Sequence, residues 1–140
     1  MTTTATHLNS KTPQLSDTVT HGIRVGATAF YLPEESLPDE RRYLFGYRIV
    51  IVNEGKVTAT LRTRHWKIID ARGTIEEVHG EGVVGQQPRL APGEGFKYTS
   101  YCPLTTEWGT MEGHYDFVTD TGEKLPVTIG RFYLATSKRQ

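Results

Sequence analysis

The sequence predicts an all-β protein, an immunoglobulin- or fibronectin type III-like β-sandwich of about seven antiparallel strands. Apolar and polar residues alternate with period two through most of the chain after residue 18, which is typical of half-buried strands. Clusters of Gly, Pro, Asn and Asp separate these runs at near-regular spacing. No run has the period of an amphipathic helix. A small closed barrel is the alternative architecture.

The first three strands follow from this alternation. The run over 19–31 predicts one long strand, because its apolar residues fall at every second position. The run over 42–53 is dense in aromatic and β-branched residues and ends in an Asn-Glu-Gly turn. The third strand begins at Val57, and its apolar residues later change parity. Such a phase change predicts a β-bulge near Thr63, Arg64 and His65.

Four further strands complete the predicted sandwich, over 74–79, 96–102, 111–117 and 127–134. The Asp-Thr-Gly turn at 120–122 joins the last two as a hairpin. A change of parity near Gly130 predicts a second bulge. Cys102 alternates in phase with the apolar residues of its strand, so we expect an inward-facing, inert thiol.

Length and composition limit the kind of protein. The chain of 140 residues fits one domain, which we place at 18–140 behind a polar, flexible tail over 1–17. Lys plus Arg and Asp plus Glu each number 16, so nucleic acid is not an expected partner. No apolar run is long enough for a membrane helix. A single cysteine and the lack of a signal peptide predict a cytoplasmic protein.

Gly80, Gly82 and Gly85 spell G-x-G-x-x-G, a pattern found in nucleotide-binding loops. Phosphate binding by such a loop needs a helix after the last glycine. Pro88 and a second proline follow within a few residues and preclude that helix. We therefore expect a tight crossover between sheets. The open alternative is a nest of glycine N–H groups that holds an anion, with Arg89 or another arginine supplying charge.

The sequence predicts no catalytic residues, no cofactor and no metal ligands, and therefore no enzyme. Four histidines, His21, His65, His79 and His114, lie on different predicted strands and lack the spacing of metal-binding motifs. A cross-strand site that joins His65 to His79 or His114 is the alternative, but hydrogen-bonded histidines are the expectation. The acidic residues over 34–40 lie between prolines, and we expect them to be solvated.

The run over 80–115 closely resembles the signature of the ApaG family: G-x-G-V-V-G-x-x-P, then L-x-P-G-E-x-F-x-Y-x-S, then L-x-T-x-x-G-x-M-x-G-x-Y. The resemblance extends over about 18–135. It implies a fibronectin type III-like fold, a genetic link to cobalt and magnesium tolerance, and no established catalytic residues. Similar domains in certain eukaryotic proteins resemble protein-binding modules. Trp108 departs from the pattern, since a smaller residue is expected there.

These observations predict a small non-enzymatic binding module for an unidentified protein partner. The expected contact residues are Gly80, Gly82, Val83, Val84, Gly85, Gln86, Gln87 and Pro88, together with Trp108. We place Trp108 in a loop, where it is either a lid on the core or an anchor for a partner. Homodimerisation through an exposed sheet edge is a further expectation. The alternative function is binding of an anion, a polyphosphate or a divalent cation by the Gly80–Gly85 loop.

Overall fold

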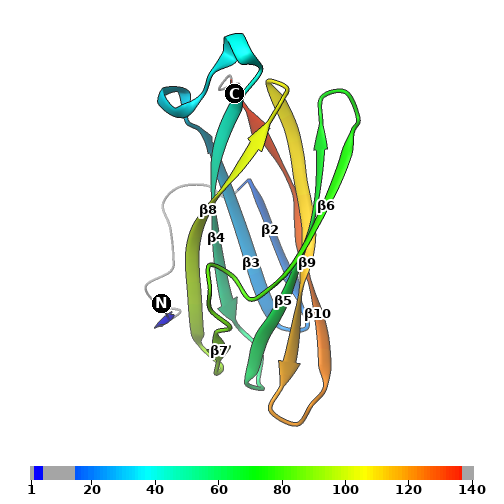
Figure 1. Ribbon diagram of the computed structural model, residues 1–140. Helices are drawn as coiled ribbons and strands as arrows, with labels where there is room; N and C mark the ends of the chain where they lie inside the picture. The colour runs from blue at the N-terminus through cyan, green and yellow to red at the C-terminus, as the bar shows by residue number, and fades with distance from the viewer. Residues whose placement is uncertain (1, 5–14, 137–140) are drawn as a thin grey trace.

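The computed structural model describes residues 2–4 and 15–136, whose strands form two antiparallel sheets packed face to face (Figure 1). The strands are β1 (Thr2–Thr4), β2 (Ser16–Thr20), β3 (Ile23–Tyr31), β4 (Tyr43–Asn53), β5 (Ala59–Asp70), β6 (Ile75–Glu81), β7 (Arg89–Leu90), β8 (Glu94–Leu104), β9 (Trp108–Thr119) and β10 (Lys124–Ala135). The first sheet has the order β1-β8-β4-β3-β2. The second has the order β10-β9-β5-β6, and β7 pairs with β5. The predicted all-β sandwich is confirmed.

The long first strand predicted over 19–31 is wrong, because β2 and β3 form a hairpin. His21 and Gly22 make the turn, with φ angles of 52° and 81°. Positive φ at both central residues is the mark of a two-residue type I′ turn. In this turn Thr20 pairs with Ile23, so the parity of the inward-facing residues reverses and Val19 is exposed on the other face. The apolar letters of the sequence nevertheless stay in phase across the turn. The pattern alone could not separate this hairpin from one continuous strand.

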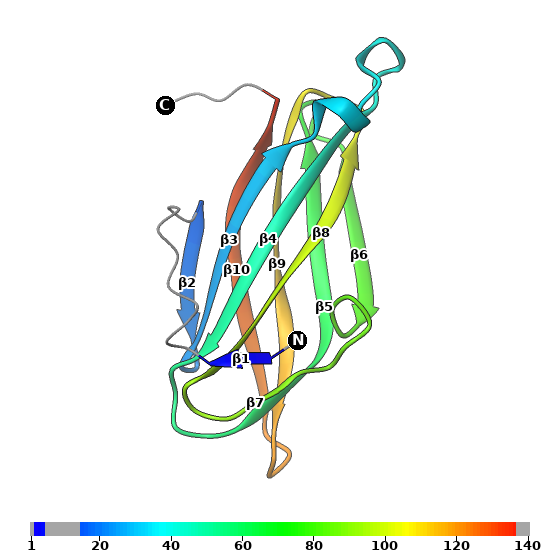
Figure 2. The ribbon, with the colours of Figure 1, turned by 90° about the vertical axis from the view of Figure 1, so that its left-hand side faces the viewer.

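Strand β2 closes one side of the sandwich against β10 (Figure 2). Ser16 Oγ donates to the Gly130 carbonyl and Thr18 Oγ1 to the Thr128 carbonyl, both at 2.9 Å. The Thr128 N–H donates in turn to Thr20 Oγ1 at 3.2 Å. These bonds satisfy backbone groups of Thr128 and Gly130 at the outer edge of β10, so this part of the edge is not open to strand addition.

Both predicted bulges are present and return side chains to the core. The strand register shifts between Leu61 and Thr63 on β5, and between Ile129 and Phe132 on β10. After these shifts Trp66 and Phe132 are buried between the sheets, with ring centroids 6.0 Å apart. Each bulge therefore changes which residues of its strand face the core, and which face solvent on the outer surface.

The Cys102 thiol lies in this core, as predicted. The residue is 3% exposed, and burial raises the pKa of the thiol to about 12. The thiolate is the nucleophilic form, so Cys102 is inert at neutral pH. Among the described residues, the helical segments are two short 3-10 turns, Pro33–Glu35 and Pro38–Glu40.

The predicted tail falls mostly outside the described residues. Residues 1 and 5–14 are not described, while Thr2–Thr4 pairs with β8 and Ser16 begins β2. No helix in the described part of the chain is both long and apolar enough to cross a membrane.

Candidate functional site

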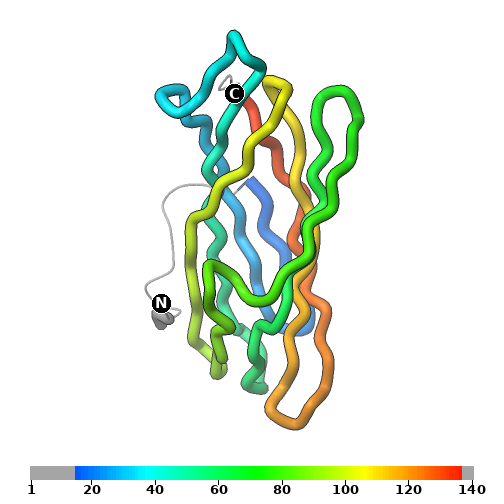
Figure 3. Tube along the Cα trace, in the orientation of Figure 1, coloured from blue at the N-terminus to red at the C-terminus, as the bar shows by residue number. Residues whose placement is uncertain are grey.

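The crossover from Gly80 to Pro88 leaves β6 and runs across the side of the sandwich opposite β2 (Figure 3). It contains a two-residue turn, in which Val83 and Gln86 exchange backbone hydrogen bonds of 2.8 and 2.9 Å. Val83 is buried, whereas Val84 is exposed. After the turn the chain continues to β7 without a helix. The tight turn is present, but the segment does not cross between the sheets as predicted, because β6 and β7 both pair with β5 of the second sheet. The setting that a dinucleotide loop needs is missing.

Val84 is in a strained backbone conformation. Its φ is 44°, and Gly85 beside it has a φ of 82°. A β-branched residue is an outlier in this left-handed region, whereas Asn before Gly is the pair that a type I′ turn prefers. We expect Val84→Asn to raise the free energy of unfolding by about 1 kcal/mol.

Chemical denaturation compares this variant with Val57→Asn, which removes an equally exposed valine outside such a turn. No stabilisation by Val84→Asn relative to Val57→Asn would show that the turn is not strained.

Arg64 is the cationic residue at this crossover. Its strand partner is Gly80, and a Cβ at Gly80 would lie 2.6 Å from the guanidinium carbon. Glycine at this position therefore leaves the space through which the arginine passes. The guanidinium donates to the carbonyls of Glu81 and Gly82 at 3.0 and 2.8 Å. Within residues 2–4 and 15–136, no carboxylate lies within ion-pair distance of it.

A cavity of about 280 Å³ opens between the two sheets beside Arg64. Its other lining residues include Tyr47, Tyr98, Ser100, Val83 and Val84. Burial raises the pKa of Tyr47 above its ordinary value, so its hydroxyl keeps its proton at neutral pH. The Tyr98 hydroxyl is hydrogen-bonded to that of Tyr115.

Most backbone N–H groups of the crossover already donate hydrogen bonds to other groups of the protein. Gly82 N–H donates to the Arg62 carbonyl at 2.8 Å, and the amides of Val83 and Gln86 close the turn. Arg89, the arginine named from sequence, pairs instead with Asp120 at 2.6 Å. An anion at this place would therefore be held by side chains of the cavity rather than by a nest of glycine amides.

Trp108 is the first residue of β9, not a loop residue as predicted. Its ring stacks on Tyr133 of β10, with centroids 6.2 Å apart. The two residues are 45% and 59% exposed, which rules out a lid on the core. Thr106 Oγ1 donates to the Trp108 carbonyl at 2.7 Å and accepts from Ala71 N–H at 3.1 Å. These bonds hold the backbone beneath the exposed rings.

The crossover and Trp108 lie apart along β5. Gly80 pairs with Arg64, whereas Gly109, next to Trp108, pairs with Asp70 six residues further along β5. At about 3.3 Å per residue the two places are about 20 Å apart. The two places are therefore not adjacent, and one contact surface that contains both stays a prediction.

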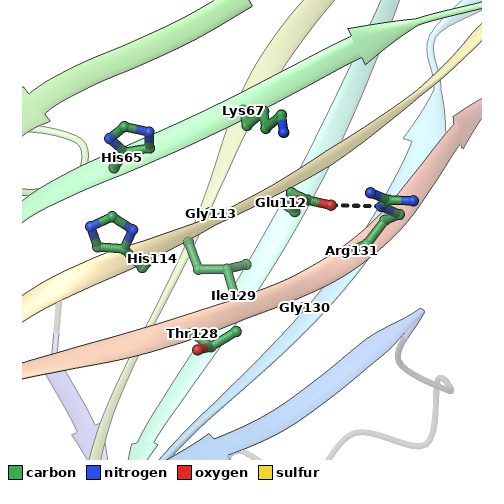
Figure 4. A pocket seen from close by; sticks show the side chains of 9 residues that line it. All are labelled: His65, Lys67, Glu112, Gly113, His114, Thr128, Ile129, Gly130 and Arg131. Carbon is green, nitrogen blue, oxygen red and sulfur yellow. Dashed lines mark hydrogen bonds and ion pairs between the residues drawn. The ribbon is translucent and has the colours of Figure 1, made fainter. Parts of the chain in front are cut away.

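The outer face of the second sheet carries three successive cross-strand rows. The row nearest Trp108 contains Ile75, Ile69, Thr110 and Tyr133. The next row alternates in charge and contains Glu77, Lys67, Glu112 and Arg131. Figure 4 shows Lys67, Glu112 and Arg131 of this row around a shallow pocket, with Glu112 bonded to Arg131 at 2.6 Å.

The third row brings together three histidines from β6, β5 and β9. His65 is the strand partner of both His79 and His114. Its ring stacks on that of His114, with centroids 4.9 Å apart (Figure 4). On the other side its Nδ1 lies 3.0 Å from His79 Nδ1. Sequence spacing could not show this convergence, because each histidine comes from a different strand.

Comparisons with known proteins agree with the fold. The family model for the ApaG domain matches residues 33–119. Protein ApaG of Methylobacterium sp. (strain 4-46) is 52% identical over 115 residues, which cover 82% of this chain and 88% of the relative. Protein ApaG of Stenotrophomonas maltophilia is 46% identical over 121 residues, covering 86% and 95%. A crystal structure from Bordetella pertussis, described as ApaA, has a TM-score of 0.82 at 45% identity and covers 86% and 98%.

Proposed function

This chain belongs to the ApaG family, and from that premise we propose that it is a non-enzymatic module that binds a protein partner through Trp108 and Tyr133. The single observation that carries the proposal is the exposed, stacked ring pair. Tryptophan and tyrosine are enriched among the residues that dominate binding energy at protein interfaces. Rings held on a rigid strand lose little conformational entropy when a partner covers them.

The surroundings of the ring pair support this proposal. Ile75 lies in the same cross-strand row as Tyr133 and is also exposed. The charged row beside it contains residues of both signs, including the bonded pair Glu112 and Arg131. An apolar centre with a polar rim is the usual anatomy of a protein interface. The link to cobalt and magnesium tolerance that the family implies would then act through the partner.

Affinity capture with single variants tests the proposal. Wild type, Trp108→Ala, Tyr133→Ala and Tyr101→Ala are compared as folded bait in extracts from the source cells. Tyr101 is as exposed as Tyr133 but lies on β8 of the other sheet, so it is the matched control. We expect wild type and Tyr101→Ala to recover the same partner in equal amounts. Trp108→Ala and Tyr133→Ala are expected to bind it about 30-fold more weakly, which corresponds to about 2 kcal/mol of binding free energy. Equal recovery by all four proteins would refute the proposal.

The second candidate function is binding of a phosphate-bearing anion in the cavity beside Arg64. The half-buried guanidinium without a carboxylate partner among the described residues favours it, since phosphate pairs well with arginine. Titration of pyrophosphate followed by amide NMR is the test. We expect shifts at Val83 and Tyr98 in wild type and in the exposed control Arg62→Gln, and none in Arg64→Gln. Unchanged spectra of wild type at millimolar pyrophosphate would exclude this candidate.

A further inference from the structure

We propose that His65, His79 and Glu77 form a binding site for a borderline transition-metal ion such as Zn²⁺ on the outer face of the second sheet. One ligand atom from each of these three residues lies within 4.8 Å of the other two. Two of the residues come from β6 and one from β5, which are paired strands. The site therefore stands on regular sheet and not on a loop.

The Nδ1 atoms of the two imidazole rings lie near the spacing that one metal ion requires, whereas the rings themselves are perpendicular with centroids 4.0 Å apart, so one ring must turn to direct both lone pairs at the ion. Zn–N bonds of about 2.0–2.1 Å place two nitrogens on one tetrahedral ion about 3.3 Å apart. The Nδ1 atoms of His65 and His79 are 3.0 Å apart. Without a metal, one of these nitrogens must donate a proton to the other. A metal ion takes both Nδ1 lone pairs when each neutral ring carries its proton on Nε2.

Glu77 supplies the negative charge that a cation needs. Its Oε1 lies 3.4 Å from His65 Nε2, and its side chain is 53% exposed. The carboxylate can therefore turn onto the ion as a third ligand without leaving a buried position, and water completes the coordination. Two nitrogens and one oxygen suit Zn²⁺ or Ni²⁺ better than Mg²⁺, which prefers oxygen ligands only.

The second sheet holds the ring of His65, the middle histidine of the row, in place. His65 is half-buried, and its ring stacks on His114 from β9. The His114 Nε2 lies 3.6 Å from Asp116 Oδ1, on the side away from His79. His114 therefore orients the central ring but is not a ligand in this arrangement. His65 is four residues along β5 from the row of Tyr133, or about 13 Å, and of the three ligands only Glu77 also belongs to the charged row that borders the proposed protein contact.

Isothermal titration calorimetry of the full chain with ZnCl₂ tests the site. We expect saturable binding by wild type, and at least about tenfold weaker binding by His65→Ala and by His79→Ala. Glu77→Gln is expected to weaken binding severalfold. Its matched control is Glu76→Gln, an exposed glutamate one position away on the other face of β6, which is expected to bind as wild type does. MgCl₂ is expected to give no binding heat.

Far-ultraviolet circular dichroism and melting curves without metal confirm that each variant is folded. His114→Ala is expected to retain binding within about threefold, because it removes one stacked ring and neither a ligand nor a hydrogen bond to a ligand. The proposal is overturned if wild type shows no saturable binding of ZnCl₂ up to about 100 μM, a concentration at which a site with a Kd of about 10 μM is about nine-tenths filled. It is also overturned if His65→Ala or His79→Ala binds as tightly as wild type, or if Glu76→Gln loses as much affinity as Glu77→Gln.

Discussion

Gly113→Ala is expected to lower the free energy of unfolding by about 3 kcal/mol or more, the upper range for overpacking. Gly113 lies on β9 directly opposite Trp66 of β5. A Cβ at this position would be 1.9 Å from the His65 carbonyl oxygen and 3.1 Å from the Trp66 Cα. Both atoms belong to the backbone, so no side-chain movement relieves the overlap. The strands must separate, which breaks the pairing at the centre of the second sheet.

Urea denaturation measures this loss, with Gly122→Ala as the control. Gly122 has a φ of +93°, and a Cβ added to it would meet no atom within 4 Å beyond its chain neighbours. Alanine at this position is destabilised only by its positive φ, which lowers the free energy of unfolding by about 1 kcal/mol. A loss in Gly113→Ala no larger than that in Gly122→Ala would mean that β5 and β9 are not as close as the structure shows.

Asn53→Asp is expected to destabilise the protein by about 3 kcal/mol at pH 7, because it places a buried charge against acceptors. Asn53 is 1% exposed. Its Nδ2 donates to the carbonyls of Val57 and Leu90 at 2.8 and 2.9 Å, and its Oδ1 accepts from Gly55 N–H. A carboxylate at this position still accepts a hydrogen bond from Gly55 N–H. Its second oxygen cannot donate, and it repels the carbonyl oxygens of Val57 and Leu90.

The loss of stability should depend on pH. Burial and the two carbonyls raise the pKa of the introduced carboxyl above its unfolded value of about 3.9. Its protonated form is thus favoured in the folded state, so the loss is small below about pH 4 and grows as the pH rises. Gln87→Glu, an exposed amide-to-acid change in the crossover, should cost less than about 0.5 kcal/mol. A loss for Asn53→Asp that is equal at pH 4 and pH 7 would contradict this expectation.

The sequence was sufficient for the fold class and most strands because alternation reports directly which residues face the core. Parity changes even located the bulges near Thr63 and Gly130. The hairpin at His21 and Gly22 was missed, because the exposed Val19 is in sequence phase with the buried Ile23, which hides the reversal of parity at the turn. Asn53 was predicted only as a turn residue. Its bond to Leu90 joins positions 37 residues apart, which no local pattern encodes.

The candidate sites were harder to predict from the sequence than the fold, because they depend on the register of the paired strands. The ring pair needs Thr110 opposite Tyr133 so that Trp108 reaches Tyr133 diagonally. The histidine row needs His65 opposite both His79 and His114. A shift of one residue in either pairing would send these side chains to the other face. The spacing of residues along the chain does not contain that register.

The most direct test of the protein-binding proposal is photo-crosslinking in cells that express the protein from its own locus. A benzophenone amino acid is placed at Tyr133 or, as the control, at the equally exposed Tyr101. We predict a discrete adduct of higher mass from position 133 that disappears when Trp108→Ala is added, and no such adduct from position 101. No adduct from position 133, or the same adduct from both positions, would contradict the proposal.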